Sequence, residues 1–219
     1  MKSVKYNQSG FTLVEIAVVL VIIGLLLGGV LKGQEMIENS RIKSVAADLR
    51  GISAAYNSYV DRFHAVPGDE LLATMTGRGW TSTVGGNADN VLAITPAQAF
   101  TNAGEEPSFW QALRGAGFIA GDPAAVGVAA LPKAGTTGLI GVAVGPYGLT
   151  GLSACTSGLT TKQARGVDTI IDGIDQNSTG DARAINGAAN PLAPVAAAPA
   201  ATAYNETTIV NTWTLCRPL

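Results

Sequence analysis

A continuous apolar segment near the amino terminus constrains this chain more than any other feature of its sequence. The segment runs from Phe11 to Leu31 (FTLVEIAVVLVIIGLLLGGVL) and contains one charged residue, Glu15. As a helix rising about 1.5 Å per residue it would span about 31 Å, which matches the hydrocarbon core of a bilayer. It ends in VLKG (residues 30–33), which lacks the small-x-small cleavage site of a secretory signal peptide. The sequence therefore predicts a helix that is retained in the membrane.

The same helix is expected to continue well past the membrane. Residues 34–62 contain no Pro and only one Gly, Gly51. Apolar residues then follow one another in alternating steps of three and four, which places them along one helix face. This apolar seam consists of Ile42, Val45, Leu49, Ile52, Tyr56, Tyr59 and Phe63. We expect one helix over residues 11–63, with residues 11–31 in the membrane and the seam buried against a partner surface.

Composition narrows the classes of function that remain. The chain has 219 residues, a formal net charge of −2, one His and two Cys. The small net charge gives no reason to expect nucleic acid as a primary partner. One His and two distant Cys exclude most zinc sites and Cys–His catalytic pairs. Because no pair of nucleophile and base is recognisable, we expect a protein that is not an enzyme.

The stretch SGFTLVE (residues 9–15) resembles the processing site of type IV pilins and type II secretion pseudopilins. In that family a short basic leader, here residues 1–10, ends in Gly and precedes an apolar helix. The resemblance implies that a prepilin peptidase cuts after Gly10 and that Phe11 becomes the N-methylated amino terminus. It also implies that Glu15 is retained inside the helix for assembly.

The cost of Glu15 in the membrane supports that role but leaves an alternative open. An ionised carboxylate in an apolar span costs about 2.5–3.5 kcal/mol by insertion scales. In a growing filament, the new α-amine on Phe11 of one subunit would pair with Glu15 of its neighbour, so that each buried charge compensates the other. Alternatively, Glu15 lies near the lipid headgroups and reaches out to them.

Small residues recur within and just after the apolar segment. Gly24, Gly28, Gly29 and Gly33 form two G-x-x-x-G spacings, which allow close helix packing but are also common in membrane helices generally. Position 32 is Lys, and no Pro lies between Phe11 and Val66. Many major subunits of the resembled family carry a Pro in this part of the helix. The sequence is therefore also compatible with a minor subunit.

Residues 64–219 are expected to form a globular head outside the cytoplasm. The breakers Pro67 and Gly68 follow the long helix directly. Within the head we predict helices at 107–113 and 161–174, the second capped by Thr160 or Thr161, strands at 139–144 and 207–216, and loops at 77–90 and 190–202. The predicted fold class is α+β, with the apolar seam packed on a small antiparallel sheet in a pilin-like ladle.

Two sets of head residues suggest specific chemistry. If the head is extracytoplasmic, Cys155 and Cys216 should form a disulfide, a pattern that also resembles the family; the alternative is two buried thiols in a cytoplasmic domain. Asp172, Asp175 and Asp181 would suit a Ca²⁺ ion, as in some pseudopilin heads, or form a solvated acidic face, which we favour. No other cofactor is expected.

The predicted function is structural. We expect a pilin, major or minor, of a type IV pilus-like filament, with a type II secretion pseudopilin as the alternative. An alternative of another class is a membrane-anchored binding module that never polymerises. The resemblance implies as partners other pilin subunits, the prepilin peptidase, an inner-membrane platform protein and an assembly ATPase. It places the chain in the bacterial inner membrane before assembly, and in an extracellular pilus or periplasmic pseudopilus afterwards.

Overall fold

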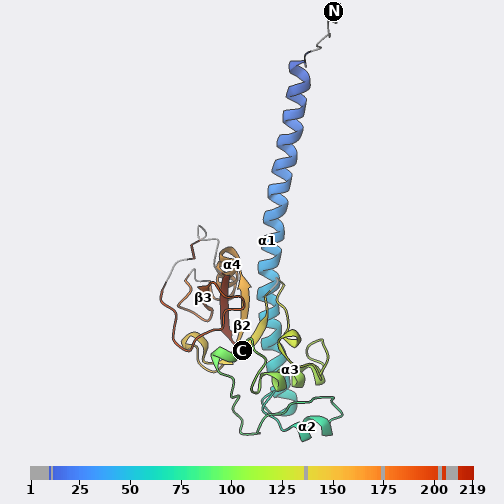
Figure 1. Cartoon of the computed structure of the whole chain (residues 1–219), viewed down its shortest axis with the longest axis vertical. Coiled ribbons are helices and arrows are strands. Elements are labelled where there is room, and N and C mark those ends of the chain that lie inside the picture. Colours follow the sequence, from blue (N-terminus) through green and yellow to red (C-terminus); the bar gives the residue numbers. More distant parts are fainter. Residues whose placement is uncertain (1–9, 11, 136–137, 174–175, 202–203, 206–211) are drawn as a thin grey trace, which may run out of the picture. The chain divides into compact units, whose positions relative to one another are not determined.

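The computed structural model describes residues 10, 12–135, 138–173, 176–201, 204–205 and 212–219. The chain divides into two compact units, Met1–Ser40 and Arg41–Leu219. One helix, α1 (Leu13–Phe63), supplies most of the first unit and continues into the second (Figure 1). The helix predicted over residues 11–63 is therefore confirmed over its described part, with its end at the predicted residue. Phe11 lies outside the described residues.

The second unit contains a four-stranded antiparallel sheet. Its strands are β1 (Ile140–Val144), β2 (Leu152–Leu159), β3 (Arg183–Gly187) and β4 (Thr212–Pro218), in the spatial order β1-β2-β4-β3. The register pairs Cys155 on β2 directly with Cys216 on β4. The sheet thus joins segments far apart in the sequence, and its C-terminal strand lies between two others.

The second unit also contains three shorter helices. They are α2 (Leu72–Gly77), α3 (Glu106–Gly115) and α4 (Thr161–Asp172), accompanied by 3-10 turns at Pro96–Gln98, Val128–Ala130 and Pro146–Gly148. Helix α4 begins with a capping box, in which the Thr160 hydroxyl accepts a hydrogen bond from the Gln163 backbone N–H at 3.2 Å. This confirms Thr160 as the cap. The helix ends at Gly173, whose φ of +76° suits a left-handed cap.

The apolar seam of α1 is buried, as predicted. Tyr56 and Phe63 are partly buried, and the other seam residues are nearly inaccessible to solvent. Together with residues of the sheet and of α3 and α4 they form one continuous hydrophobic core. In Figure 1, α4 lies beside the second half of α1, and the Arg50 side chain donates a hydrogen bond to the Ile170 carbonyl at 3.1 Å. The α+β layout, with a long helix packed on a small antiparallel sheet, is confirmed.

Aromatic side chains connect the end of α1 to the rest of the second unit. Tyr56 stacks on Phe109 of α3 with a centroid distance of 6.5 Å, and Phe63 meets Trp80 edge to face at 5.4 Å. The turn that follows α1 requires Gly68, whose φ is +96° and where a Cβ would lie 2.7 Å from the Phe109 Cα. The end of the long helix predicted at Pro67-Gly68 is therefore also the turn that brings α3 against α1.

The structure corrects several expectations. The segment 77–90 is irregular, but it is not simply exposed: Ser82 is buried, and a Cβ at Gly86 would lie 2.4 Å from the Asp69 Cα. The buried Asp69 carboxylate accepts hydrogen bonds from the backbone N–H groups of Asp89 and Asn90, which holds the segment down. Strands β2 and β3 were not predicted. The strand expected at 207–216 is described from Thr212 onward, because 206–211 lie outside the described residues.

Candidate functional site: the amino-terminal assembly segment

The sequence Thr12-Leu13-Val14-Glu15 builds a capping box at the start of α1. The Glu15 carboxylate accepts hydrogen bonds from the Thr12 backbone N–H and from its hydroxyl, both at 2.8 Å. In return the Thr12 hydroxyl accepts a hydrogen bond from the Glu15 backbone N–H at 3.3 Å. This reciprocal pattern satisfies two amide groups that the first helical turn leaves without partners.

This capping role of Glu15 is one that the sequence reasoning missed. The signal was present, since Thr followed three residues later by Glu, just before an apolar run, is the capping-box pattern. The carboxylate also lies at the helix end whose dipole favours negative charge. In this chain, therefore, Glu15 is held at the amino-terminal end of the helix, exposed and close to residue 11 in sequence.

The first unit presents an almost continuous apolar surface. The large apolar side chains between Leu13 and Leu31 are 45–90% exposed. Within the described part of the chain, α1 is the helix long and apolar enough to cross a membrane. So much exposed apolar surface is not stable in water, because each side chain gains about 1.5–3 kcal/mol on burial. It requires a bilayer or other helices around it.

The predicted packing glycines face open space within this chain. A Cβ added at Gly24, Gly28, Gly29 or Gly33 would meet no other described atom of the chain within 4 Å. Nothing inside the described chain therefore explains these glycines, and their role in packing against other helices stays a prediction. Beyond them, the exposed ion pair between Lys32 and Glu35, at 2.8 Å, marks the polar end of the segment.

Comparison with known families identifies the segment. Residues 5–31 match the family model described as "Prokaryotic N-terminal methylation motif". The chain carries the prepilin signature of type IV pilins and pseudopilins. The match covers the predicted cut after Gly10, the start of the helix and Glu15. No curated protein and no solved structure matches the chain.

The structure describes only some of the residues that form this prepilin signature. Gly10 is described and exposed, whereas Phe11 and residues 1–9 of the leader lie outside the described residues. The cut after Gly10 and the methylation of Phe11 therefore remain predictions at the level of single residues. The apolar helix and the signature together fit anchoring of the chain in a membrane.

The predicted disulfide of the head is present. Cys155 and Cys216 are bonded across the adjacent strands β2 and β4 and are fully buried. The bond closes a sequence separation of 61 residues and fixes the C-terminal strand in the sheet. The alternative of two free buried thiols is wrong.

The predicted calcium site is not assembled among the described residues. The Asp172 carboxylate accepts a hydrogen bond from the Ala182 backbone N–H at 3.1 Å, and Asp181 is exposed. Asp175 lies outside the described residues. In the part of the chain that is described, no group of three or more His, Cys, Asp or Glu side chains is placed to hold a metal ion. Calcium binding by this set stays a prediction.

A partly buried polar triad in the head was not foreseen from the sequence. Glu70 accepts a hydrogen bond from the Tyr59 hydroxyl of α1 and two hydrogen bonds, each 2.6 Å long, from the Arg78 guanidinium. Burial by itself raises the pKa of Glu70, but the hydrogen bonds from Arg78 and Tyr59 lower it overall. The triad ties the segment around α2 to the end of α1. No local sequence pattern signals such a contact, because its members come from separate elements.

Proposed function

We propose that this chain is a structural subunit of a type IV pilus-like filament. It is stored in the bacterial inner membrane by residues 11–31, cut after Gly10 and polymerised through its amino-terminal helix. A minor subunit fits the absence of Pro between Phe11 and Val66. The head, outside the cytoplasm, carries the disulfide that such a compartment permits.

One observation carries this proposal: the prepilin signature lies on a helix whose apolar side chains are exposed along its whole first half. A bilayer satisfies that surface before assembly. Neighbouring helices satisfy it in a filament, so that extraction from the membrane exchanges lipid contacts for protein contacts. The signature supports the same reading, because processing creates a positive α-amine at the start of that surface.

The decisive experiment is mass spectrometry of the amino terminus, performed on a sheared surface fraction and on the periplasm of the native cells. We expect the chain to begin at Phe11, to carry one methyl group and to be recovered in the sheared fraction. Recovery from periplasmic fibres alone would make it a secretion pseudopilin. A chain that retains residues 1–10, or is found only in the membrane, would contradict the proposal.

A pair of substitutions separates the charge of Glu15 from its capping role. Glu15→Gln keeps a side chain that caps the helix but removes the negative charge, so filament yield should fall to background. Thr12→Ala keeps the charge but removes the cap, at a cost of about 1 kcal/mol of helix stability, and filaments should persist. The measurement is the amount of processed subunit in the sheared fraction.

Both outcomes of this pair can contradict the assembly role. If Glu15→Gln forms filaments at the normal level, the charge is not needed and a simple anchor becomes the better description. If Thr12→Ala abolishes filaments while Glu15→Gln does not, the segment serves helix capping alone. Processing after Gly10 is monitored in both variants, so that a failure of the peptidase is not mistaken for a failure of assembly.

A further inference from the structure

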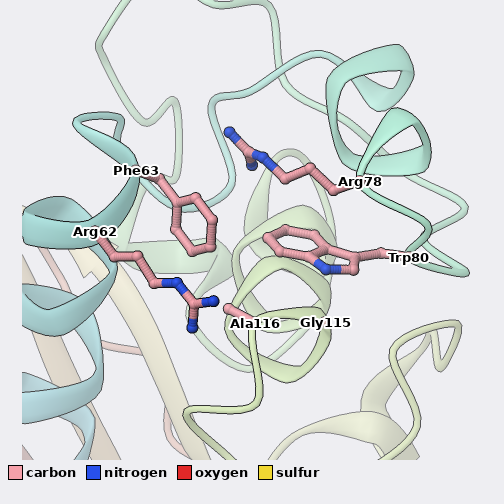
Figure 2. A pocket seen from close by; sticks show the side chains of 6 residues that line it. All are labelled: Arg62, Phe63, Arg78, Trp80, Gly115 and Ala116. Carbon is pink, nitrogen blue, oxygen red and sulfur yellow. The ribbon is translucent and has the colours of Figure 1, made fainter.

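A pocket of about 350 Å³ lies in the second unit, where three segments meet. It is lined by Arg62 and Phe63 from the end of α1, Arg78 and Trp80 from the segment after α2, and Gly115 and Ala116 at the end of α3. Figure 2 shows both aromatic rings and both arginine side chains around this space. Neither the prepilin signature nor the proposed assembly uses any of these residues. The volume is within the range of small-molecule sites in proteins.

The pocket has a fixed aromatic wall. Phe63 and Trp80 meet at an interplanar angle of 87°, so each ring limits the movement of the other. Trp80 lies directly on the end of α3, since a Cβ at Gly115 would come within 2.7 Å of its indole ring. Gly115 and Ala116 complete the lining of the pocket beside the rings. The wall is therefore formed before any ligand arrives.

The two arginines differ in their electrostatic state. Arg78 makes a bidentate ion pair with Glu70, and its guanidinium lies 4.4 Å from the Phe63 ring centroid. Its charge is thus compensated, and its position is fixed. Arg62 is exposed and lies 5.3 Å from the same centroid, and no described carboxylate forms an ion pair with it. The pocket consequently offers one uncompensated guanidinium beside an aromatic wall.

The helix ends around the pocket limit the charge that it can accept. Helices α1 and α3 both end here, and the carbonyl groups of a helix C-terminus carry partial negative charge. That charge partly offsets Arg62 and disfavours a multiply charged anion such as phosphate. A single carboxylate fits better, because its one negative charge is opposed less by these carbonyl groups while a guanidinium still binds it with two parallel hydrogen bonds.

We propose that this pocket binds a small ligand made of one six-membered ring that carries one carboxylate. The carboxylate pairs with Arg62, and an apolar face of the ring rests on Trp80 and Phe63. A uronic acid sugar and an aromatic acid share this chemistry, and the experiment distinguishes these two sources. The inference goes beyond the proposed function, because it does not depend on polymerisation.

The test is a titration of the full-length chain in nonionic detergent micelles at pH 7 and low salt. Binding is monitored by ligand-observed saturation-transfer NMR. The probes are galacturonate, benzoate and inorganic phosphate, each added separately. Ligands of this size and a partly open pocket lead us to expect a Kd of about 1 mM. If only galacturonate binds saturably, the pocket is a sugar site. If only benzoate does, it is a site for aromatic acids. If both bind, the pocket recognises the chemistry that the two acids share. No saturable binding by either ring acid, or equally tight binding of phosphate, overturns the proposal.

Two variants and a matched control locate the binding. Arg62→Gln should weaken the affinity of the ring acid at least about tenfold without harming the fold, because Arg62 is exposed. Arg41→Gln makes the same change on the same helix, outside the pocket, and should leave the affinity unchanged. Ala116→Leu keeps every charge but fills the space, and it should abolish binding. If Arg62→Gln binds the ring acid as well as the unmodified chain does, the proposal is wrong.

Discussion

At the scale of single residues, Glu106 is a carboxylic acid that the fold of the head buries. It lies in the first turn of α3, is completely buried, and accepts hydrogen bonds from the backbone N–H groups of Asn102 at 2.9 Å and Val142 at 3.2 Å. Burial raises the pKa of Glu106 to about 8, although these hydrogen bonds act in the opposite direction. The carboxyl group thus joins α3 to β1 and carries a proton at neutral pH.

Glu106 should make the stability of the head depend on pH. In the unfolded chain the carboxyl loses its proton near its ordinary pKa of 4.5, but in the folded chain only near 8. The folded state is therefore destabilised as the pH rises between these two values, and its stability changes little outside them. The free energy of unfolding should fall by a few kcal/mol from pH 5 to pH 8. In Glu106→Gln this fall should be much smaller, as measured by urea unfolding at each pH. Parallel profiles for the two proteins would show that the carboxyl is ionised in the folded state.

The residues that the sequence predicted and those that it missed differ in how local their contacts are. The cleavage motif is defined by neighbours in the sequence and was recognised from them; the Thr12–Glu15 cap is equally local and could have been recognised. The contact of Glu70 with Tyr59 of α1 and the burial of Glu106 against β1 depend on segments that meet only in the folded head. No local pattern of residues could reveal them.

At the scale of elements, the same reasoning explains which helices and strands were found. The seam of α1 and the apolar face of α4 repeat at helical spacing, so their periodicity was visible. Strand β2 (LSACTSGL) is buried along almost its whole length and is rich in small and polar residues, so it shows no alternation of apolar and polar positions. Strand β3 (RAING) is short and ends in Asn-Gly, which by itself favours a turn.

The disulfide between β2 and β4 should contribute much of the stability of this sheet. By the chain-entropy treatment, closing a separation of 61 residues stabilises the fold by about 4 kcal/mol. Replacing both Cys155 and Cys216 by Ala should therefore shift urea unfolding of the head to clearly lower concentrations, and reductant should then have no further effect. Single replacements are avoided, because the remaining thiol can react between chains. A midpoint equal to that of the unmodified chain would mean that the sheet is held by packing alone.

At the scale of the whole molecule, the two halves of helix α1 have different surroundings. From Arg41 onward, α1 completes the core of the second unit, whereas its earlier apolar side chains find no partner within the described chain. The folding of the head and the demand for a membrane or for other subunits thus reside in successive parts of a single element. In the proposed filament, this division would let the exposed surface exchange lipid contacts for protein contacts without any change in the core of the head.

A matched pair of leucines tests this division. Leu49→Ala removes a fully buried side chain of the seam and should destabilise the head by about 2–5 kcal/mol in urea unfolding monitored by tryptophan fluorescence. Leu27→Ala makes the same change on the same helix, where the side chain is 60% exposed, and should leave that unfolding midpoint unchanged. Its effect should appear instead as a lower yield of assembled subunits. If Leu27→Ala destabilises the head as much as Leu49→Ala does, the two parts of α1 are not independent and the apolar surface of the first unit contributes to folding of the head.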